Sequence, residues 1–93
     1  IDIPRNILDA MYYHHERNDG SGYPEGLKKE SIPLFAKIIG LSETFAALIA
    51  HRAYRDKVDY AQALAIIRDS RTKFDREIIE ALTSVVQSTG SYK

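Results

Sequence analysis

Apolar residues recur every three or four positions in four segments of the chain, a spacing typical of amphipathic α-helices. The first predicted helix runs from about Pro4 to about Glu16, because proline suits a first helical turn, where its missing N–H costs nothing. Its helically spaced positions are Ile7, Leu8, Met11, Tyr12 and His15. The chain is therefore expected to begin with one amphipathic helix.

A second, long helix is expected to end near His51. Ser31 is a suitable N-cap for it, and Pro33 falls just inside its first turn. One continuous apolar face is marked by Leu34, Ile38, Leu41, Phe45 and Leu48.

A third helix is predicted from about Tyr60 to Asp69. Asp59 and Gln62 match the spacing of a capping box at its start, and Leu64 and Ile67 lie on the face behind it.

A fourth helix follows the Phe74–Asp75 pair, where Phe74 is placed to pack on Ile79 as a hydrophobic staple. Its apolar stripe continues through Ile78, Leu82, Val85 and Val86. The polar tail from Ser88 to Lys93 is expected to fray. Since no strand-like alternation competes with these patterns, the predicted fold class is all-α, a helical bundle fragment of about four to five helices.

The segment between the first two helices, from Arg17 to Ile32, has no periodicity. Residues 19–26 include three glycines and a proline, which predicts a long loop with a specified backbone shape. The glycines could adopt positive φ, Asp19 could bond its own loop backbone, and Tyr23 offers a ring to pack. We therefore expect this loop to be ordered without help from a ligand.

The composition of the chain argues for some classes of protein and against others. The 93 residues make one small domain, which buries only about two thirds of its unfolded surface, so exposed apolar faces are expected. Thirteen basic and thirteen acidic residues cancel, which disfavours binding to DNA or to an anionic membrane. No apolar run approaches the roughly 20 residues that span a bilayer. The absence of cysteine excludes disulfides and thiolate metal sites and suggests the cytoplasm.

His14 and His15 stand next to each other, directly before an acid, near the predicted end of the first helix. Neutral imidazoles favour divalent transition metals. Adjacent side chains on a helix point about 100° apart, so both reach one site only if the site is wide or the helix is ending. The alternative is one packed and one exposed histidine without a ligand.

The eleven residues from His14 to Pro24 resemble the signature of the HD-GYP family, whose name includes Gly-Tyr-Pro as in residues 22–24. Segments 26–27, 32–38 and 52–55 and the Phe74–Asp75 pair also fall at the family's spacings. The resemblance covers nearly the whole chain.

This resemblance implies an all-helical, metal-dependent phosphohydrolase domain that hydrolyses cyclic di-GMP through two or three metal ions, often iron or manganese. By position, His14 and His15 match metal-binding histidines of the family. Arg52 and Arg55 match cations that meet the phosphates of the cyclic dinucleotide, although both could simply be solvated charges after a helix end.

The resemblance also implies a partner for the signature loop. Asp19, Gly20, Gly22, Tyr23 and Pro24 match the family's loop, which could dock a diguanylate cyclase domain with Tyr23 as an aromatic anchor.

Two departures from the family bear on catalysis. The family's His-Asp pair is absent and would lie upstream of residue 1, so residues 1–93 match the C-terminal part of the domain. Glu43 stands where the family has an aspartate ligand, and Ala46 replaces a second aspartate. A carboxylate one methylene longer shifts a ligand, and alanine cannot serve as one.

We therefore predict a truncated or degenerate domain, a regulatory or protein-interaction module without activity of its own, in which any metal is held by His14, His15 and Glu43. The alternative is the C-terminal half of a metal-dependent phosphodiesterase, and a third reading is a helical domain that binds neither metal nor nucleotide. A homodimer is expected to cover the exposed apolar face.

Overall fold

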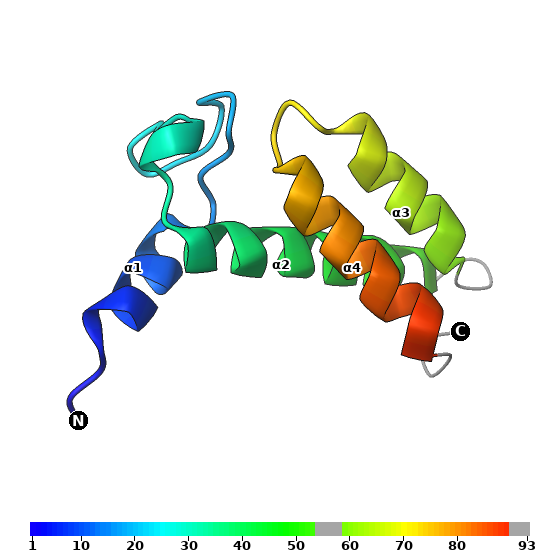
Figure 1. Cartoon of the computed structure of the whole chain (residues 1–93), viewed down its shortest axis with the longest axis horizontal. Helices are drawn as coiled ribbons and strands as arrows, with labels where there is room; N and C mark the ends of the chain where they lie inside the picture. Colours follow the sequence, from blue (N-terminus) through cyan, green and yellow to red (C-terminus); the bar gives the residue numbers. More distant parts are fainter. Residues whose placement is uncertain (54–58, 90–93) are drawn as a thin grey trace.

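The computed structural model describes residues 1–53 and 59–89 as an all-α fold, as predicted (Figure 1). Within these ranges there is no strand, and the only bridge of β type pairs Asp19 with Lys28. The elements in chain order are α1 (Arg5–Tyr13), the short 3-10 turn η1 (Lys29–Ser31), α2 (Leu34–Ala53), α3 (Tyr60–Asp69) and α4 (Arg76–Thr89).

Helix α2 is the axis of the molecule (Figure 1). Helix α1 contacts its N-terminal half, and α3 and α4 pack together against its C-terminal half. The connection between α1 and α2, residues 14–33, folds above the junction of these two helices. The main core lies between α2, α3 and α4 and consists of Leu41, Phe45, Ala63, Leu64, Ile67, Phe74, Ile79 and Val86.

Helix α3 has the predicted bounds because its N-cap is encoded locally. The carboxylate of Asp59 accepts hydrogen bonds from the backbone N–H of Ala61 (3.0 Å) and of Gln62 (3.3 Å). Leu64 and Ile67 are buried, as predicted.

Helix α4 begins where the staple pattern placed it. The carbonyl of Asp75 accepts the N–H of Ile79 at 3.0 Å, and both Phe74 and Ile79 are buried in the core. The helix continues through Thr89, so Ser88 is helical, contrary to the expected frayed tail, while residues 90–93 lie outside the described residues.

The predicted end of α1 at Glu16 is wrong, since the helix ends at Tyr13. His14 is the C-cap, and the guanidinium of Arg17 turns back to bind the carbonyls of His14 and Glu16. A long cationic side chain thus satisfies carbonyl groups that further helical turns would otherwise have used.

The predicted N-cap of α2 at Ser31 is also wrong. Ser31 closes η1, and its N–H donates to the carbonyl of Lys28 at 2.8 Å. The carbonyl of Pro33 accepts the N–H of Lys37, so Pro33 occupies the cap position and α2 begins at Leu34.

The apolar face predicted for α2 divides into two parts. Leu41 and Phe45 are buried in the core, whereas Leu34 and Ile38 are exposed because α3 and α4 cover only the other half of the helix. Eight large apolar residues of α1 and of the first part of α2 are exposed, and we refer to them together as the apolar face: Ile7, Leu8, Met11, Tyr12, Leu34, Phe35, Ile38 and Ile39. Among the described residues, no helix is both long and apolar enough to cross a membrane.

Candidate metal centre

His14, His15 and Glu43 come together where α1 ends beside the middle of α2. One possible ligand atom from each residue lies within 4.8 Å of the others. The two histidines share one site because the helix has already ended: their ring centroids are 4.1 Å apart and the ring planes differ by 38°. Two imidazoles and a carboxylate form a donor set that suits divalent first-row transition metals.

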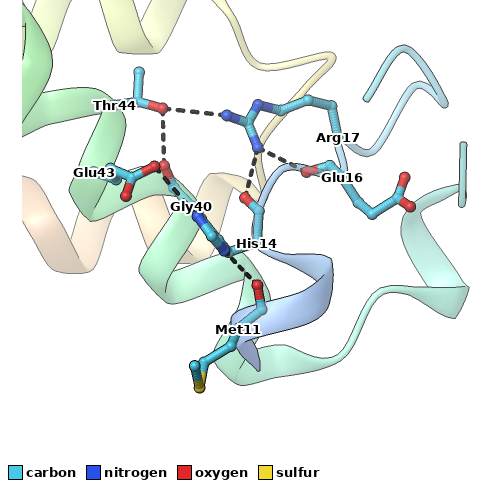
Figure 2. Close-up of polar contacts among 7 residues, drawn as sticks. All are labelled: Met11, His14, Glu16, Arg17, Gly40, Glu43 and Thr44. Atoms are coloured by element: carbon cyan, nitrogen blue, oxygen red, sulfur yellow. Dashed lines mark hydrogen bonds and ion pairs between the residues drawn. The ribbon is translucent and has the colours of Figure 1, made fainter. Parts of the chain in front are cut away.

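The hydrogen bonds of His14 determine which of its ring nitrogens is available (Figure 2). Nδ1 lies 2.8 Å from the carbonyl oxygen of Met11, and since a carbonyl only accepts, Nδ1 carries the proton. Nε2 lies 3.4 Å from Oε1 of Glu43. In the neutral ring this nitrogen and the carboxylate oxygen both carry free lone pairs, so both atoms can serve as ligands of one metal cation.

Exposure differs across the cluster. The His14 side chain is 20% exposed and the Glu43 side chain 59% exposed, so the site is open to solvent on the Glu43 side. A histidine that donates its other ring N–H to a backbone carbonyl is the usual arrangement of a metal ligand. The residues present therefore fit a divalent transition metal with open coordination positions.

His15 is covered by the loop. The ring of Tyr23 stacks on the His15 ring with a centroid distance of 4.7 Å and an interplanar angle of 16°. The backbone N–H of Tyr23 donates to the carbonyl of His15 at 3.3 Å. The loop thus contacts one of the candidate ligands directly.

Arg17 joins the segments that carry these ligands (Figure 2). Its Nη1 donates to the carbonyls of His14 (3.0 Å) and Glu16 (2.8 Å), and its Nη2 lies 3.5 Å from the hydroxyl of Thr44, the neighbour of Glu43. Burial lowers the pKa of the guanidinium, while nearby acidic groups, Glu43 among them, oppose the shift.

Two further contacts fix the Arg17 guanidinium, which acts as a clamp between the segments of His14 and Thr44. The guanidinium of Arg17 lies 5.0 Å from the centre of the Phe74 ring, a cation–π contact with the core. The Thr44 hydroxyl donates to the carbonyl of Gly40 at 2.8 Å (Figure 2).

Gly40 allows α1 and α2 to approach at the site. A Cβ at this position would lie 2.5 Å from the carbonyl oxygen of His14 and 3.2 Å from Nη1 of Arg17. Sequence reasoning missed Gly40, although a glycine inside a helical pattern is a recognisable signal of close packing.

The loop has the local contacts that its sequence suggested. Oδ1 of Asp19 accepts the N–H of Ser21 at 2.9 Å, and hydrogen bonding from Ser21 lowers the pKa of Asp19. Gly20 has φ of 82°, as expected. Gly22 does not adopt positive φ; it is needed because a Cβ would lie 2.6 Å from the backbone nitrogen of Arg17. Pro24 is exposed.

Glu16 is the most informative residue that sequence reasoning missed. The residue is 4% exposed, and both carboxylate oxygens accept backbone N–H groups of the loop: Oε2 from Glu25 at 2.7 Å and Oε1 from Leu27 at 2.8 Å. An acid at the start of a glycine-rich loop, whose many N–H groups need acceptors, is the signal that could have indicated this role.

The loop is also tied to the far helices through Asn18. Its side chain donates to Oδ1 of Asp75 at 2.5 Å, and its backbone N–H donates to the carbonyl of Lys73 at 2.9 Å. Lys37 of α2 forms an ion pair with the same Asp75 carboxylate at 3.2 Å. Burial alone would raise the pKa of Asp75, but the bonds from Asn18 and Lys37 outweigh it and lower the pKa.

The remaining predicted site residues are placed only in part. Arg55 lies outside the described residues, and so does the side chain of Arg52, although its backbone belongs to α2. Ala46 is exposed one turn after Glu43. No carboxylate is therefore available at position 46 to join the cluster.

A family model described as "HD domain" matches residues 1–78. The chain is 45% identical over 69 residues to a probable cyclic di-GMP phosphodiesterase of Vibrio cholerae, and 31% identical over 88 residues to a cyclic di-GMP phosphodiesterase of Borreliella burgdorferi. It is also 41% identical over 70 residues to a phosphodiesterase of Vibrio cholerae specific for 3'3'-cGAMP.

These alignments cover 73%, 94% and 74% of the chain. They cover only 16%, 23% and 15% of the respective relatives. The chain thus spans less than a quarter of the length of each of these relatives.

Proposed function

Because this chain belongs to the HD domain family and is of its HD-GYP type, we propose that it acts in cyclic dinucleotide signalling as a regulatory, metal-binding module without phosphodiesterase activity of its own. The observation that carries the proposal is the cluster of His14, His15 and Glu43, which offers three ligands, beside Ala46, which offers none. Three ligands suffice for one metal ion and are too few for a multinuclear centre.

The geometry supports a ligand role for His14 and for Glu43. His14 supplies Nε2, since its Nδ1 donates to Met11, and Glu43 supplies a carboxylate from the neighbouring helix. His14, His15 and Glu43 would hold a divalent ion, iron or manganese in our proposal, and this ion would neutralise phosphate charge on a bound cyclic dinucleotide. Arg52 and Arg55 are proposed to contact the phosphates of the cyclic dinucleotide, as bidentate guanidinium groups do.

The proposed ligand is a cyclic dinucleotide, since the relatives include phosphodiesterases for cyclic di-GMP and for 3'3'-cGAMP. We propose that the chain works in the cytoplasm, in keeping with its lack of cysteine.

Incubation of the chain with Mn²⁺ or Fe²⁺ and cyclic di-GMP, followed by chromatography for the linear dinucleotide, tests the absence of activity. We expect no turnover. Metal-dependent turnover that His15→Ala abolishes would contradict this.

A second candidate function is that of the C-terminal half of an active phosphodiesterase. It is favoured by the exposure of Glu43, whose side chain is 59% exposed, because the open side of the cluster leaves room for further ligands supplied by another polypeptide. Addition of a separate polypeptide carrying the family's His-Asp half should then restore turnover, and failure to do so would support the regulatory module.

Two partners complete the proposal. The apolar face is proposed to pair with a second copy of the chain, and Ile38→Asp should then convert a dimeric mass in light scattering to a monomeric one, whereas Glu77→Gln on α4 should not. A monomeric mass for the unmodified chain would contradict the dimer.

The loop is proposed to dock a diguanylate cyclase domain through Tyr23, whose side chain is prominent at the surface with 60% of the residue exposed. Tyr23→Ala should weaken this binding, and Glu30→Gln in η1 is the matched control. Equal binding by both variants would rule out Tyr23 as the anchor.

A further inference from the structure

Three properties distinguish Glu16: it follows the histidine pair directly, it is 4% exposed, and it does not belong to the candidate metal cluster. Its two carboxylate oxygens are both engaged by the loop, through the N–H groups of Glu25 and Leu27. A buried carboxylate held by backbone donors is an acceptor of strong, short hydrogen bonds. Glu16 is therefore built to hold the loop and is unsuited to bind a metal.

The loop acts on His15 through Tyr23, which lies two residues before Glu25. The Tyr23 ring stacks on the His15 ring at 4.7 Å, and the Tyr23 N–H donates to the His15 carbonyl. Gly22 packs directly against the backbone of residues 15–17, with no room for a Cβ. Fixing the N–H groups on one side of Tyr23 thus fixes the ring that covers His15.

We infer that Glu16 is a positioning residue for His15: its carboxylate holds the loop so that the Tyr23 ring orients the His15 imidazole toward the cluster. The link from Glu16 to the His15 ring stands on the hydrogen bonds and stacking alone. The effect of Glu16 on metal affinity rests on the proposed metal-binding function. The position of the His15 ring and the metal affinity are therefore measured in separate experiments.

Accepting both backbone N–H groups requires a carboxylate on a side chain as long as that of glutamate. Glu16→Gln keeps the shape but replaces one acceptor oxygen by an NH₂ group, which then faces a backbone donor. Glu16→Asp keeps the charge but is one methylene too short to reach both N–H groups. Both variants loosen the loop without touching His15, whereas Tyr23→Leu removes the stacked ring and leaves the backbone contacts in place.

The first test is made on the full chain in EDTA, by recording the NMR signals of the His15 ring protons. The ring current of a stacked tyrosine shifts these signals, so Tyr23→Leu should move them toward the positions of a free imidazole. Glu16→Gln and Glu16→Asp should move them in the same direction, and Glu30→Gln, an exposed acid of the same connection, should leave them unchanged. Thermal unfolding of each variant, followed by circular dichroism, establishes that the helices are intact.

The second test is the affinity for Mn²⁺ alone, measured by calorimetry. Glu16→Gln and Tyr23→Leu should each lower it about 10-fold, the usual effect of losing a group that orients a metal ligand. His15 signals that stay in place in folded Glu16→Gln would overturn the proposed link. Signals that move while the Mn²⁺ affinity is unchanged would overturn the positioning role. If the unmodified chain bound no Mn²⁺, the proposed function would fail, and the NMR comparison alone would decide whether Glu16 orients His15.

Discussion

Nε2 of His14 lies 3.4 Å from Oε1 of Glu43, while Nδ1 of the same ring donates its proton to the carbonyl of Met11. This pair connects the end of α1 to the middle of α2 (Figure 2). Its alignment depends on how closely the two helices approach and on the clamp formed by Arg17.

Gly40→Ala is expected to destabilise the chain, although alanine is ordinarily the better helix former by about 1 kcal/mol. The added Cβ would lie 2.5 Å from the His14 carbonyl oxygen and force α1 away from α2, at a cost of about 1–3 kcal/mol for overpacking. Urea denaturation measures the difference, with Ser42→Ala at an exposed position of α2 as control. Equal or greater stability of Gly40→Ala would show that the helices do not approach as described.

Arg17→Lys is expected to lower the free energy of unfolding by about 1–3 kcal/mol, because lysine keeps the charge but cannot bind the carbonyls of His14 and Glu16 and the Thr44 hydroxyl together. The matched control is Arg76→Lys, whose exposed pairing with Glu80 should make a change of less than about 1 kcal/mol. Similar losses in the two variants would argue against the clamp.

Acid should destabilise the contact between the loop and α4 through Asp75. The pKa of this carboxyl is lowered, because the bonds from Asn18 and Lys37 outweigh the effect of burial. Its contribution is therefore fully present above the pKa of the unfolded chain, about 3.9, and is lost as the pH falls through the lower folded value. Asp75→Asn should be less stable at neutral pH and should lose less stability on acidification.

Urea denaturation at several pH values between neutral and about 3 measures how steeply the free energy of unfolding falls with pH in each variant. Some acid sensitivity should remain in Asp75→Asn, because hydrogen bonding from Ser21 also lowers the pKa of Asp19. Asp2→Asn at the exposed N-terminus is the control. An unchanged acid slope in Asp75→Asn would contradict the assignment.

The parts of the fold that were predicted well are those encoded over a few residues. Helix α3 has the expected bounds because Asp59 caps it from two and three residues away. The end of α1 was predicted three residues too late because it depends on Arg17 and on groups in α2 and the core that periodicity does not reveal.

The candidate metal centre shows the same difference between features encoded over a few residues and features that depend on distant groups. The proximity of His14 and His15 was expected if the helix ended there, and it does. The role of Glu16 could not be predicted from spacing, since its partners are backbone N–H groups nine and eleven residues away. The exposure of Leu34 and Ile38 likewise depends on which half of α2 the other helices cover.

The loop should remain ordered without metal. The amides of Ser21, Tyr23, Glu25 and Leu27 all donate to groups within the connection, namely Asp19, His15 and the Glu16 carboxylate. Hydrogen exchange at these four amides should therefore be slow and the same with and without EDTA. Fast exchange in EDTA that slows when Mn²⁺ is added would show that the metal, and not the loop's own contacts, sets its shape.

Calorimetric titration of the full chain with Mn²⁺ tests the metal site most directly. We predict one ion bound per chain, with binding lost in His15→Ala, weakened at least about 10-fold in Glu43→Gln, and unchanged in Glu77→Gln, an exposed acid of α4. Absence of binding, or equal binding by Glu43→Gln and the unmodified chain, would contradict the claim that His14, His15 and Glu43 form a metal centre.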